Sequence, residues 1–132
     1  MKKFKGKYNN FYGNFRIGED TKIGSLCDIA GIIGKNCKVQ SYVFIPSGIT
    51  IEDGCFIGPG VIFTNDKYPP SNGKHWAETF VKRGARIGAG VIVLPGITIG
   101  ENSLIGAGAV ITCDIPPNEV WVGNPAKFLR KL

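Results

Sequence analysis

Residues 81–114 read VKRGARIGAGVIVLPGITIGENSLIGAGAVITCD, and a large apolar residue occurs there at every sixth position. The same spacing runs back to Ile17, with one shorter step of four residues between Ile29 and Ile33. A six-residue period fits neither an α-helix nor a single amphipathic strand. It is typical of a β-solenoid, in which each hexapeptide forms one short strand and one turn. The apolar positions are Ile17, Ile23, Ile29, Ile33, Val39, Ile45, Ile51, Ile57, Phe63, Val81, Ile87, Val93, Ile99, Ile105 and Ile111.

Two positions beside each large apolar residue support a solenoid. The residue two places earlier is usually small or β-branched, and it shares the inward face of the strand. The residue three places later is usually Gly, Asn or Asp, which tolerate positive φ and therefore suit a corner. Leu26 and Tyr42 occupy two such corner positions. We therefore expect the backbone to turn differently at these two corners.

The repeats divide the chain into consecutive parts within one predicted domain. Residues 65–80 are polar and turn-rich, and the six-residue spacing is lost within them, so they are predicted to form a loop that leaves the solenoid. Long ordered loops in compact domains often carry function. The expected parts are a lead-in at 1–14, N-terminal coils at 15–64, the loop at 65–80, C-terminal coils at 81–114, and a tail at 115–132 that includes a short basic amphipathic helix.

The net charge of +6 is scattered, and the sequence contains no recognised nucleic-acid motif. This excess suits a phosphorylated small molecule or a plain solvated surface. The chain has neither a signal peptide nor a transmembrane stretch, which predicts a cytoplasmic location. The basic residues nearest the two ends are Lys2, Lys3, Lys5, Lys7, Lys127, Arg130 and Lys131.

The four cysteines are expected to be buried core thiols. Cys27, Cys37 and Cys55 occupy the inward small position, and Cys113 lies two residues after Ile111. Free cysteine packs as a small hydrophobe. The chain has no CxxC motif and no Cys/His cluster, so no metal site is expected.

Two stretches carry a family resemblance. Residues 56–71 read FIGPGVIFTNDKYPPS, and the chain later ends its repeats with CDIPPNEVWVGNPAKFL. Together with the hexapeptide register, these stretches resemble the left-handed β-helix acyltransferases over residues 15–132. Within that family they look like N-acetyltransferases of amino sugars carried on UDP or dTDP, which serve surface-polysaccharide or glycan synthesis. The resemblance implies an all-β left-handed parallel β-helix of about five triangular coils, assembled as a homotrimer with acetyl-CoA between neighbouring chains.

The resemblance also implies residues for binding acetyl-CoA. Backbone groups in the C-terminal coils would contact the pantetheine arm, and residues in the tail would face the phosphates. For the glycines, corner geometry is the alternative explanation, and for the tail cations it is a solvated helix face. The residues implied for the arm are Gly88, Ala89, Gly90, Ala107 and Gly108, and those implied for the phosphates are Asn124, Pro125, Lys127 and Arg130.

The predicted loop holds the candidates for chemistry. By resemblance, Asn65 positions the acceptor amine or the thioester carbonyl, while Asp66 holds a sugar group or orients the loop. Both residue types also form simple turns. Tyr68 either contacts the nucleotide sugar or packs the loop.

His75 is the only histidine, and the acceptor decides whether it is needed. A sugar hydroxyl requires a general base, whereas an amine with a pKa of about 7.7–8.0 is partly neutral at pH 7. The leading hypothesis is therefore an acetyl-CoA-dependent N-acetyltransferase in which His75 either acts in catalysis or packs the loop. The alternatives are an O-acetyltransferase that uses His75 as its base, and a non-catalytic β-helix binding module.

Overall fold

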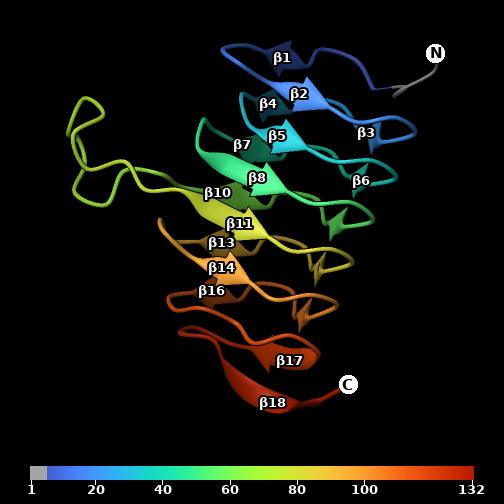
Figure 1. Cartoon of the computed structure of the whole chain (residues 1–132), viewed down its shortest axis with the longest axis vertical. Coiled ribbons are helices and arrows are strands. Elements are labelled where there is room, and N and C mark those ends of the chain that lie inside the picture. Colours follow the sequence, from blue (N-terminus) through green and yellow to red (C-terminus); the bar gives the residue numbers. More distant parts are fainter. Residues whose placement is uncertain (1–5) are drawn as a thin grey trace.

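The computed structural model describes residues 6–132, so the expectations for Lys2, Lys3, Lys5 and the start of the lead-in lie outside the described residues. Short strands stack into a three-sided solenoid, with one loop projecting from its side (Figure 1). Residues 6–132 contain no helix, and hence none of membrane-spanning length and hydropathy. The architecture is consistent with the predicted left-handed β-helix.

Each side of the solenoid is one sheet of stacked strands, and the chain passes from sheet A to sheet B to sheet C in every coil. Sheet A has six strands: β1 (Asn10–Phe11), β4 (Asp28–Ile29), β7 (Phe44–Ile45), β10 (Ile62–Phe63), β13 (Ile92–Val93) and β16 (Val110–Ile111). Sheet B has five strands: β2 (Arg16–Ile17), β5 (Ile32–Ile33), β8 (Ile49–Ile51), β11 (Thr79–Val81) and β14 (Thr98–Ile99). Sheet C has seven strands: β3 (Lys22–Ile23), β6 (Lys38–Val39), β9 (Phe56–Ile57), β12 (Arg86–Ile87), β15 (Leu104–Ile105), β17 (Glu119–Val122) and β18 (Lys127–Lys131).

The predicted apolar positions form the core. Equivalent residues of successive coils are direct neighbours, as when Ile57 pairs with Ile87 and Ile87 with Ile105. Of the fifteen predicted positions, Ile17 alone is half-buried and the others are buried. Backbone hydrogen bonds join the coils, for example from the Gly88 N–H to the Ile105 carbonyl at 2.9 Å. The six-residue repeat therefore places one large side chain per side in each coil. Sheet A has strands from six coils, one more than the sequence suggested.

The prediction that Leu26 and Tyr42 turn differently from the other corners was wrong. Their φ angles are 61° and 64°, which are close to the 74° of Gly60 at the same corner. A non-glycine residue in this conformation costs about 1–2 kcal/mol. Each of the two N–H groups donates to the coil before it, Leu26 to Lys7 and Tyr42 to Ser25, both at 3.0 Å. The stacking of the coils therefore sets the corner conformation even where the residue type opposes it.

The predicted helix in the tail is absent. Residues Lys127–Lys131 instead form β18, which pairs antiparallel with β17. Strand β17 in turn adds to the open edge of β15 in sheet C. The mixture of basic and apolar residues in the tail suits a strand as well as a short helix. The free hydrogen-bonding edge of the last coil favours the strand, because an edge offers backbone partners that an isolated helical turn lacks.

Three of the four cysteines are buried as expected, whereas Cys113 is exposed. Burial is the main cause of the raised pKa of Cys27. The pKa of the Cys55 thiol is raised first by its hydrogen bond with Cys37 and then by burial. Residues 6–132 contain no group of three or more His, Cys, Asp or Glu side chains that could hold a metal. Cys27, Cys37 and Cys55 all belong to the hydrophobic core cluster.

Candidate functional site

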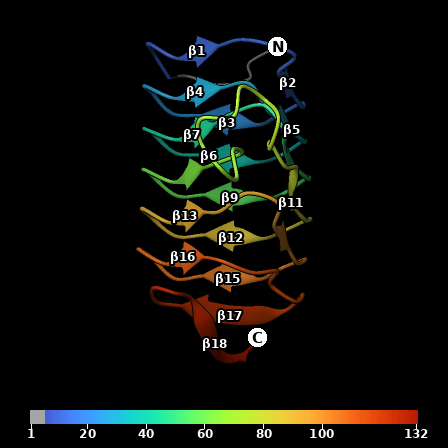
Figure 2. The same ribbon diagram turned by 90° about the vertical axis from the view of Figure 1, so that its left-hand side faces the viewer.

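The projecting loop leaves the solenoid after β10 and returns at β11, at the corner between sheets A and B (Figure 2). The two ends of the loop are joined to each other. The Ala77 N–H donates to the Asn65 carbonyl at 2.8 Å, and Asp66 and Trp76 form an antiparallel bridge. This neck holds the first and last residues of the loop side by side against the rigid coils.

The Asp66 carboxylate organises the loop. It accepts hydrogen bonds from the Ser71 hydroxyl at 2.7 Å, from the Ser71 N–H at 2.8 Å and from the Tyr68 N–H at 3.3 Å. Desolvation acts to raise the pKa of Asp66, but these hydrogen bonds, together with one from Trp76, outweigh it and lower the pKa. Of the two roles considered for Asp66, this geometry supports loop orientation.

Asn65 lies at the neck and keeps one side-chain atom free. Its Nδ2 donates to the Ser47 carbonyl of the preceding coil at 2.9 Å, which fixes the direction of the amide. No hydrogen bond within residues 6–132 uses its Oδ1. The amide therefore presents a fixed oxygen that can accept a hydrogen bond from a ligand.

Tyr68 and His75 pack against each other further out in the loop. Their ring centroids are 5.3 Å apart in an edge-to-face arrangement, and both side chains are exposed. The His75 N–H donates to the Ser71 hydroxyl oxygen at 3.0 Å, and its carbonyl accepts from the Lys67 N–H at 3.1 Å. These contacts support the loop-packing alternative for both side chains.

The short step between Ile29 and Ile33 produces a recess beside the neck. Only Ala30 and Gly31 connect β4 to β5, and both are buried at this A/B corner. A Cβ added to Gly31 would lie 2.7 Å from the Ile49 carbonyl, so the shortened corner is drawn tightly into the prism. A pocket of about 290 Å³ occupies this region, with Gly13, Asn14, Ala30, Gly31, Ser47, Gly48, Thr50 and Glu78 among its lining residues.

Glu78 is a candidate that the sequence analysis missed. It follows Ala77 of the neck directly, lies exposed at the recess, and makes no hydrogen bond or ion pair within residues 6–132. Asn65 donates to the Ser47 carbonyl, and Ser47 and Glu78 both line the recess, so Asn65 is anchored beside the recess that Glu78 borders. The signal available in the sequence was a shortened corner preceding the loop, together with an acidic residue just before the returning strand.

The residues predicted for the pantetheine arm lie at the corner between sheets C and A. Within residues 6–132, no hydrogen bond uses the N–H of Ala89 or of Ala107, and both residues are exposed. A Cβ at Gly90 or Gly108 would meet nothing within 4 Å, so the surface beside these glycines is open. Gly88 differs, because its Cβ would lie 2.7 Å from the Ala107 nitrogen. Coil stacking therefore requires glycine at 88, whereas the other two glycines border free space.

The residues predicted for the CoA phosphates lie in the β17–β18 hairpin, at the C-terminal end of the solenoid. Asn124 and Pro125 are exposed in the turn between the two strands. Lys127 pairs with Val122 and Arg130 with Val120 across a β-bulge. Residues two apart on a strand share a face, so the extra residue of the bulge brings both cations to the same face of the hairpin. Lys127 and Arg130 therefore share one face of a strand hairpin, where the sequence predicted a helix.

One chain does not bring all candidate residues together. Asn65, Glu78 and the rest of the loop group lie at the A/B corner, whereas Ala89 and Ala107 lie at the C/A corner. These two corners are opposite ends of sheet A. A site containing both groups requires a second copy of the chain.

Solved structures share this architecture. PerB from Caulobacter crescentus, solved with CoA and GDP-perosamine, matches with a TM-score of 0.81 at 23% identity over 93% of this chain and 55% of that chain. The acetyltransferase domain of PglB from Neisseria gonorrhoeae, solved with acetyl coenzyme A, matches with a TM-score of 0.80 at 25% identity over 93% of this chain and 55% of that chain. A variant of the N-acyltransferase AntD from Bacillus cereus, solved with dTDP and coenzyme A, matches with a TM-score of 0.84 at 22% identity over 95% of this chain and 78% of that chain.

The chain thus spans about half the length of the PerB and PglB chains that it matches. No curated protein matches it. The model of the bacterial transferase hexapeptide family (six repeats) matches residues 30–65 and 78–113, which is more than half of the chain. The stacked hexapeptide coils and this match show that the chain belongs to the bacterial transferase hexapeptide family.

Proposed function

We propose that this protein is an acetyl-CoA-dependent N-acetyltransferase of a sugar amine linked to UDP, dTDP or a similar nucleotide, acting in cytoplasmic synthesis of surface polysaccharide or other glycans. The observation that carries the proposal is the pair of free acceptor groups at the recess. The Asn65 Oδ1 and the Glu78 carboxylate can only accept hydrogen bonds. An ammonium or amine group is a donor, so it complements both.

In the proposed mechanism, Asn65 and Glu78 orient the amine toward the thioester carbonyl carbon of acetyl-CoA. An amine with a pKa of about 7.7–8.0 is partly neutral at pH 7, and positioning supplies much of the rate. The nitrogen becomes more acidic once it is bonded to the carbonyl carbon, and the Glu78 carboxylate takes its proton. The C–S bond then breaks, and CoA leaves as the thiolate. Acetyl-CoA supplies the activated acetyl group.

CoA is proposed to bind along the C/A corner. The free N–H groups of Ala89 and Ala107 suit the amide oxygens of a pantetheine arm, and the open surface at Gly90 and Gly108 leaves room for it. Lys127 and Arg130 would then hold the phosphate-bearing end. No side chain is needed for the backbone contacts, which explains how small residues can form this part of the site.

A homotrimer would assemble the two halves of the site. The outward side chains of Phe44, Ile62, Ile92 and Val110 form an apolar column on sheet A, and Ile62 and Ile92 are 40% and 36% exposed. If sheet A of each prism faces a threefold axis, the A/B corner of one chain lies beside the C/A corner of the next. Such a head-to-tail interface closes into a ring. The loop of one chain then lies beside the C/A corner of its neighbour, where CoA is proposed to bind.

The test is CoA release from acetyl-CoA across matched panels of nucleotide-linked amino sugars and their hydroxyl counterparts. A Cys113→Ser background removes the exposed protein thiol from the thiol assay. We expect turnover of an amine, and a loss of about 10²-fold or more in kcat in Glu78→Gln, as for removal of a proton acceptor. Glu101→Gln, an exposed carboxylate at the B/C corner, is the matched control and should leave the rate unchanged.

Two results would contradict the proposal. Turnover of hydroxyl acceptors alone would establish the O-acetyltransferase alternative and assign the base to His75. Absence of acetyl-CoA binding would instead favour a non-catalytic binding module.

A further inference from the structure

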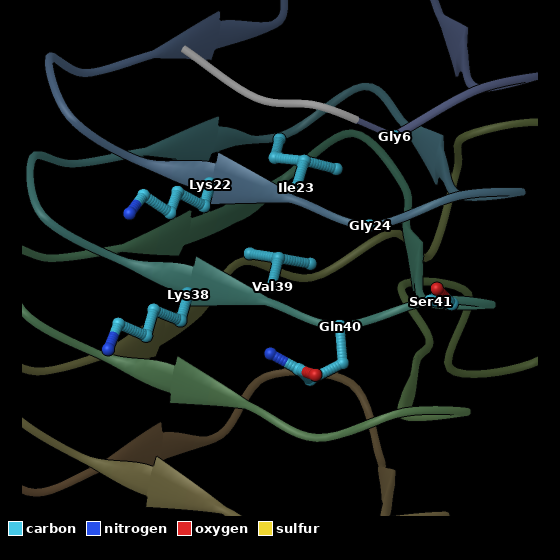
Figure 3. A pocket seen from close by; sticks show the side chains of 8 residues that line it. All are labelled: Gly6, Lys22, Ile23, Gly24, Lys38, Val39, Gln40 and Ser41. Carbon is cyan, nitrogen blue, oxygen red and sulfur yellow. The ribbon is translucent and has the colours of Figure 1, made fainter. Parts of the chain in front are cut away.

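A second pocket lies on the outer face of sheet C where it approaches the C/A corner, two coils before the loop. Its volume is about 370 Å³, and β3 and β6 form its floor. Figure 3 shows two lysine side chains on neighbouring strands that extend in the same direction along this face. The polar and small residues that line it are Gly6, Lys22, Gly24, Lys38, Gln40 and Ser41.

The positive charges of Lys22 and Lys38 have no ion-pair partner within the described residues. Lys22 and Lys38 are direct register partners on β3 and β6, so their backbones are about 4.8 Å apart. Like charges in directly opposed positions destabilise a sheet. Neither lysine forms an ion pair within residues 6–132, and Asp20, which lines the adjoining hollow with both of them, is not paired with either. The described residues therefore provide no ion-pair partner for either lysine.

The remaining lining residues are two that carry donor groups, Ser41 and Gln40, two glycines, and the apolar residues Ile23 and Val39. The Ser41 Oγ accepts from the Ser25 N–H at 3.1 Å, which leaves the Ser41 O–H free to donate. Gln40 also lines the pocket, and its amide lies on the side of β6 away from β3 (Figure 3). A Cβ at Gly24 would lie 2.7 Å from the Ser41 nitrogen and Oγ, so a side chain at this position would clash with Ser41. Figure 3 shows both lysine side chains extending away from Ser41, so the two ammonium groups form one cationic surface that complements a ligand with several anionic oxygens.

The position of the pocket indicates which anion it holds. The Ala89 and Ala107 N–H groups lie along the same C/A corner in later coils, and the loop leaves the solenoid at an intermediate level. The cation pair proposed for CoA is at the far end of sheet C, about 24 Å from Lys38 by five strand spacings of about 4.8 Å. CoA held there has no need of this pocket, whereas an acceptor on the other side of the reaction centre does.

We propose that this pocket binds the diphosphate of the nucleotide-linked acceptor, with Lys22 and Lys38 as its two cationic contacts. The inference rests on the proposed function for the identity of the ligand. The acceptor then lies along the N-terminal coils and acetyl-CoA along the C-terminal coils, and the amine meets the thioester at the level of the loop.

The test compares the wild type with a Lys22→Gln/Lys38→Gln variant by calorimetric binding of UDP, dTDP, pyrophosphate and acetyl-CoA. The matched control is Lys35→Gln, which removes an exposed lysine at the B/C corner. We expect the double variant to bind UDP or dTDP at least ~10-fold more weakly, as for lost hydrogen bonds from charged groups. Acetyl-CoA binding should be unchanged, and the melting temperature should be equal or higher because the repulsion is removed.

Unchanged UDP and dTDP binding in the double variant overturns the proposal. A loss confined to pyrophosphate also overturns it, because the pocket is then a site for free anions. The binding measurements need no turnover. If no amino sugar is acetylated but nucleotide binding still depends on the two lysines, the proposed function fails while the diphosphate site stands.

Discussion

Replacing Gly88 by alanine should destabilise the solenoid far more than the same change at Gly90, two residues away. At Gly88 the new Cβ would lie 2.7 Å from the Ala107 nitrogen and 2.9 Å from the Ile105 carbonyl oxygen. Both are backbone atoms of the next coil, so the coils must separate by several tenths of an ångström. Overpacking of this kind costs about 1–3 kcal/mol, and weakening the 2.9 Å bond from Gly88 N–H to Ile105 adds up to about 1 kcal/mol.

At Gly90 the Cβ would meet nothing within 4 Å, but φ is +68°. The cost there is about 1 kcal/mol of left-handed backbone strain. Both Gly→Ala substitutions lower the conformational entropy of the unfolded chain by the same amount, so this effect cancels in the comparison. The costs at Gly88 sum to about 1–4 kcal/mol, against about 1 kcal/mol at Gly90. Urea unfolding followed by circular dichroism should therefore place Gly88→Ala up to about 3 kcal/mol below Gly90→Ala, or about 1.5 kcal/mol below it at the middle of that range. A reversed order of the two stabilities would refute the assignment of Gly88 to coil packing.

Three further outcomes follow from the loop and the thiols. His75→Ala should lower kcat by less than about 5-fold and act mainly on KM, whereas loss of a general base would cost about 10²-fold or more. Ellman's reagent should label Cys113 at once in the folded protein and the other three thiols after unfolding, and early labelling of a second thiol would contradict their burial. The pKa of Asp66 is lowered, so its carboxylate should stabilise the loop at every pH above about 3.9, the ordinary pKa of an aspartate. This stabilisation should be lost as the pH falls through the lowered pKa. Tryptophan emission from Trp76 should report that transition, and Asp66→Asn should abolish it.

The sequence predicts the coils well because the repeat has one physical cause. A large residue such as Ile57 must fill the axis at every side of every coil, and each coil uses the same backbone hydrogen bonds. The sequence therefore specifies the register of the coils repeatedly. The corners at Leu26 and Tyr42 do not follow local residue preference, because the carbonyls of the neighbouring coil fix their conformation. The tail forms a strand for a similar reason, since the edge of β15 that pairs with β17 is a tertiary feature.

The candidate site was less predictable because it depends on which corners face each other. Asn65 could be named from its motif, and its fixed amide became visible only with the Ser47 carbonyl in place. Glu78 has an ordinary surface environment in the sequence, and the recess beside it is formed by a corner more than forty residues earlier. Spacing along a chain does not reveal a cavity of this kind.

The reversal of direction at β18 has a consequence for self-association. A stack of parallel coils could in principle grow without limit, because the last strand of each sheet offers its backbone to an identical molecule. Here the last strand of sheet C, β18, is antiparallel to the others and carries Lys127, Arg130 and Lys131. An approaching chain would meet a mismatched hydrogen-bond pattern and a row of positive charge. The hairpin therefore acts as a terminator that prevents filament growth at this end.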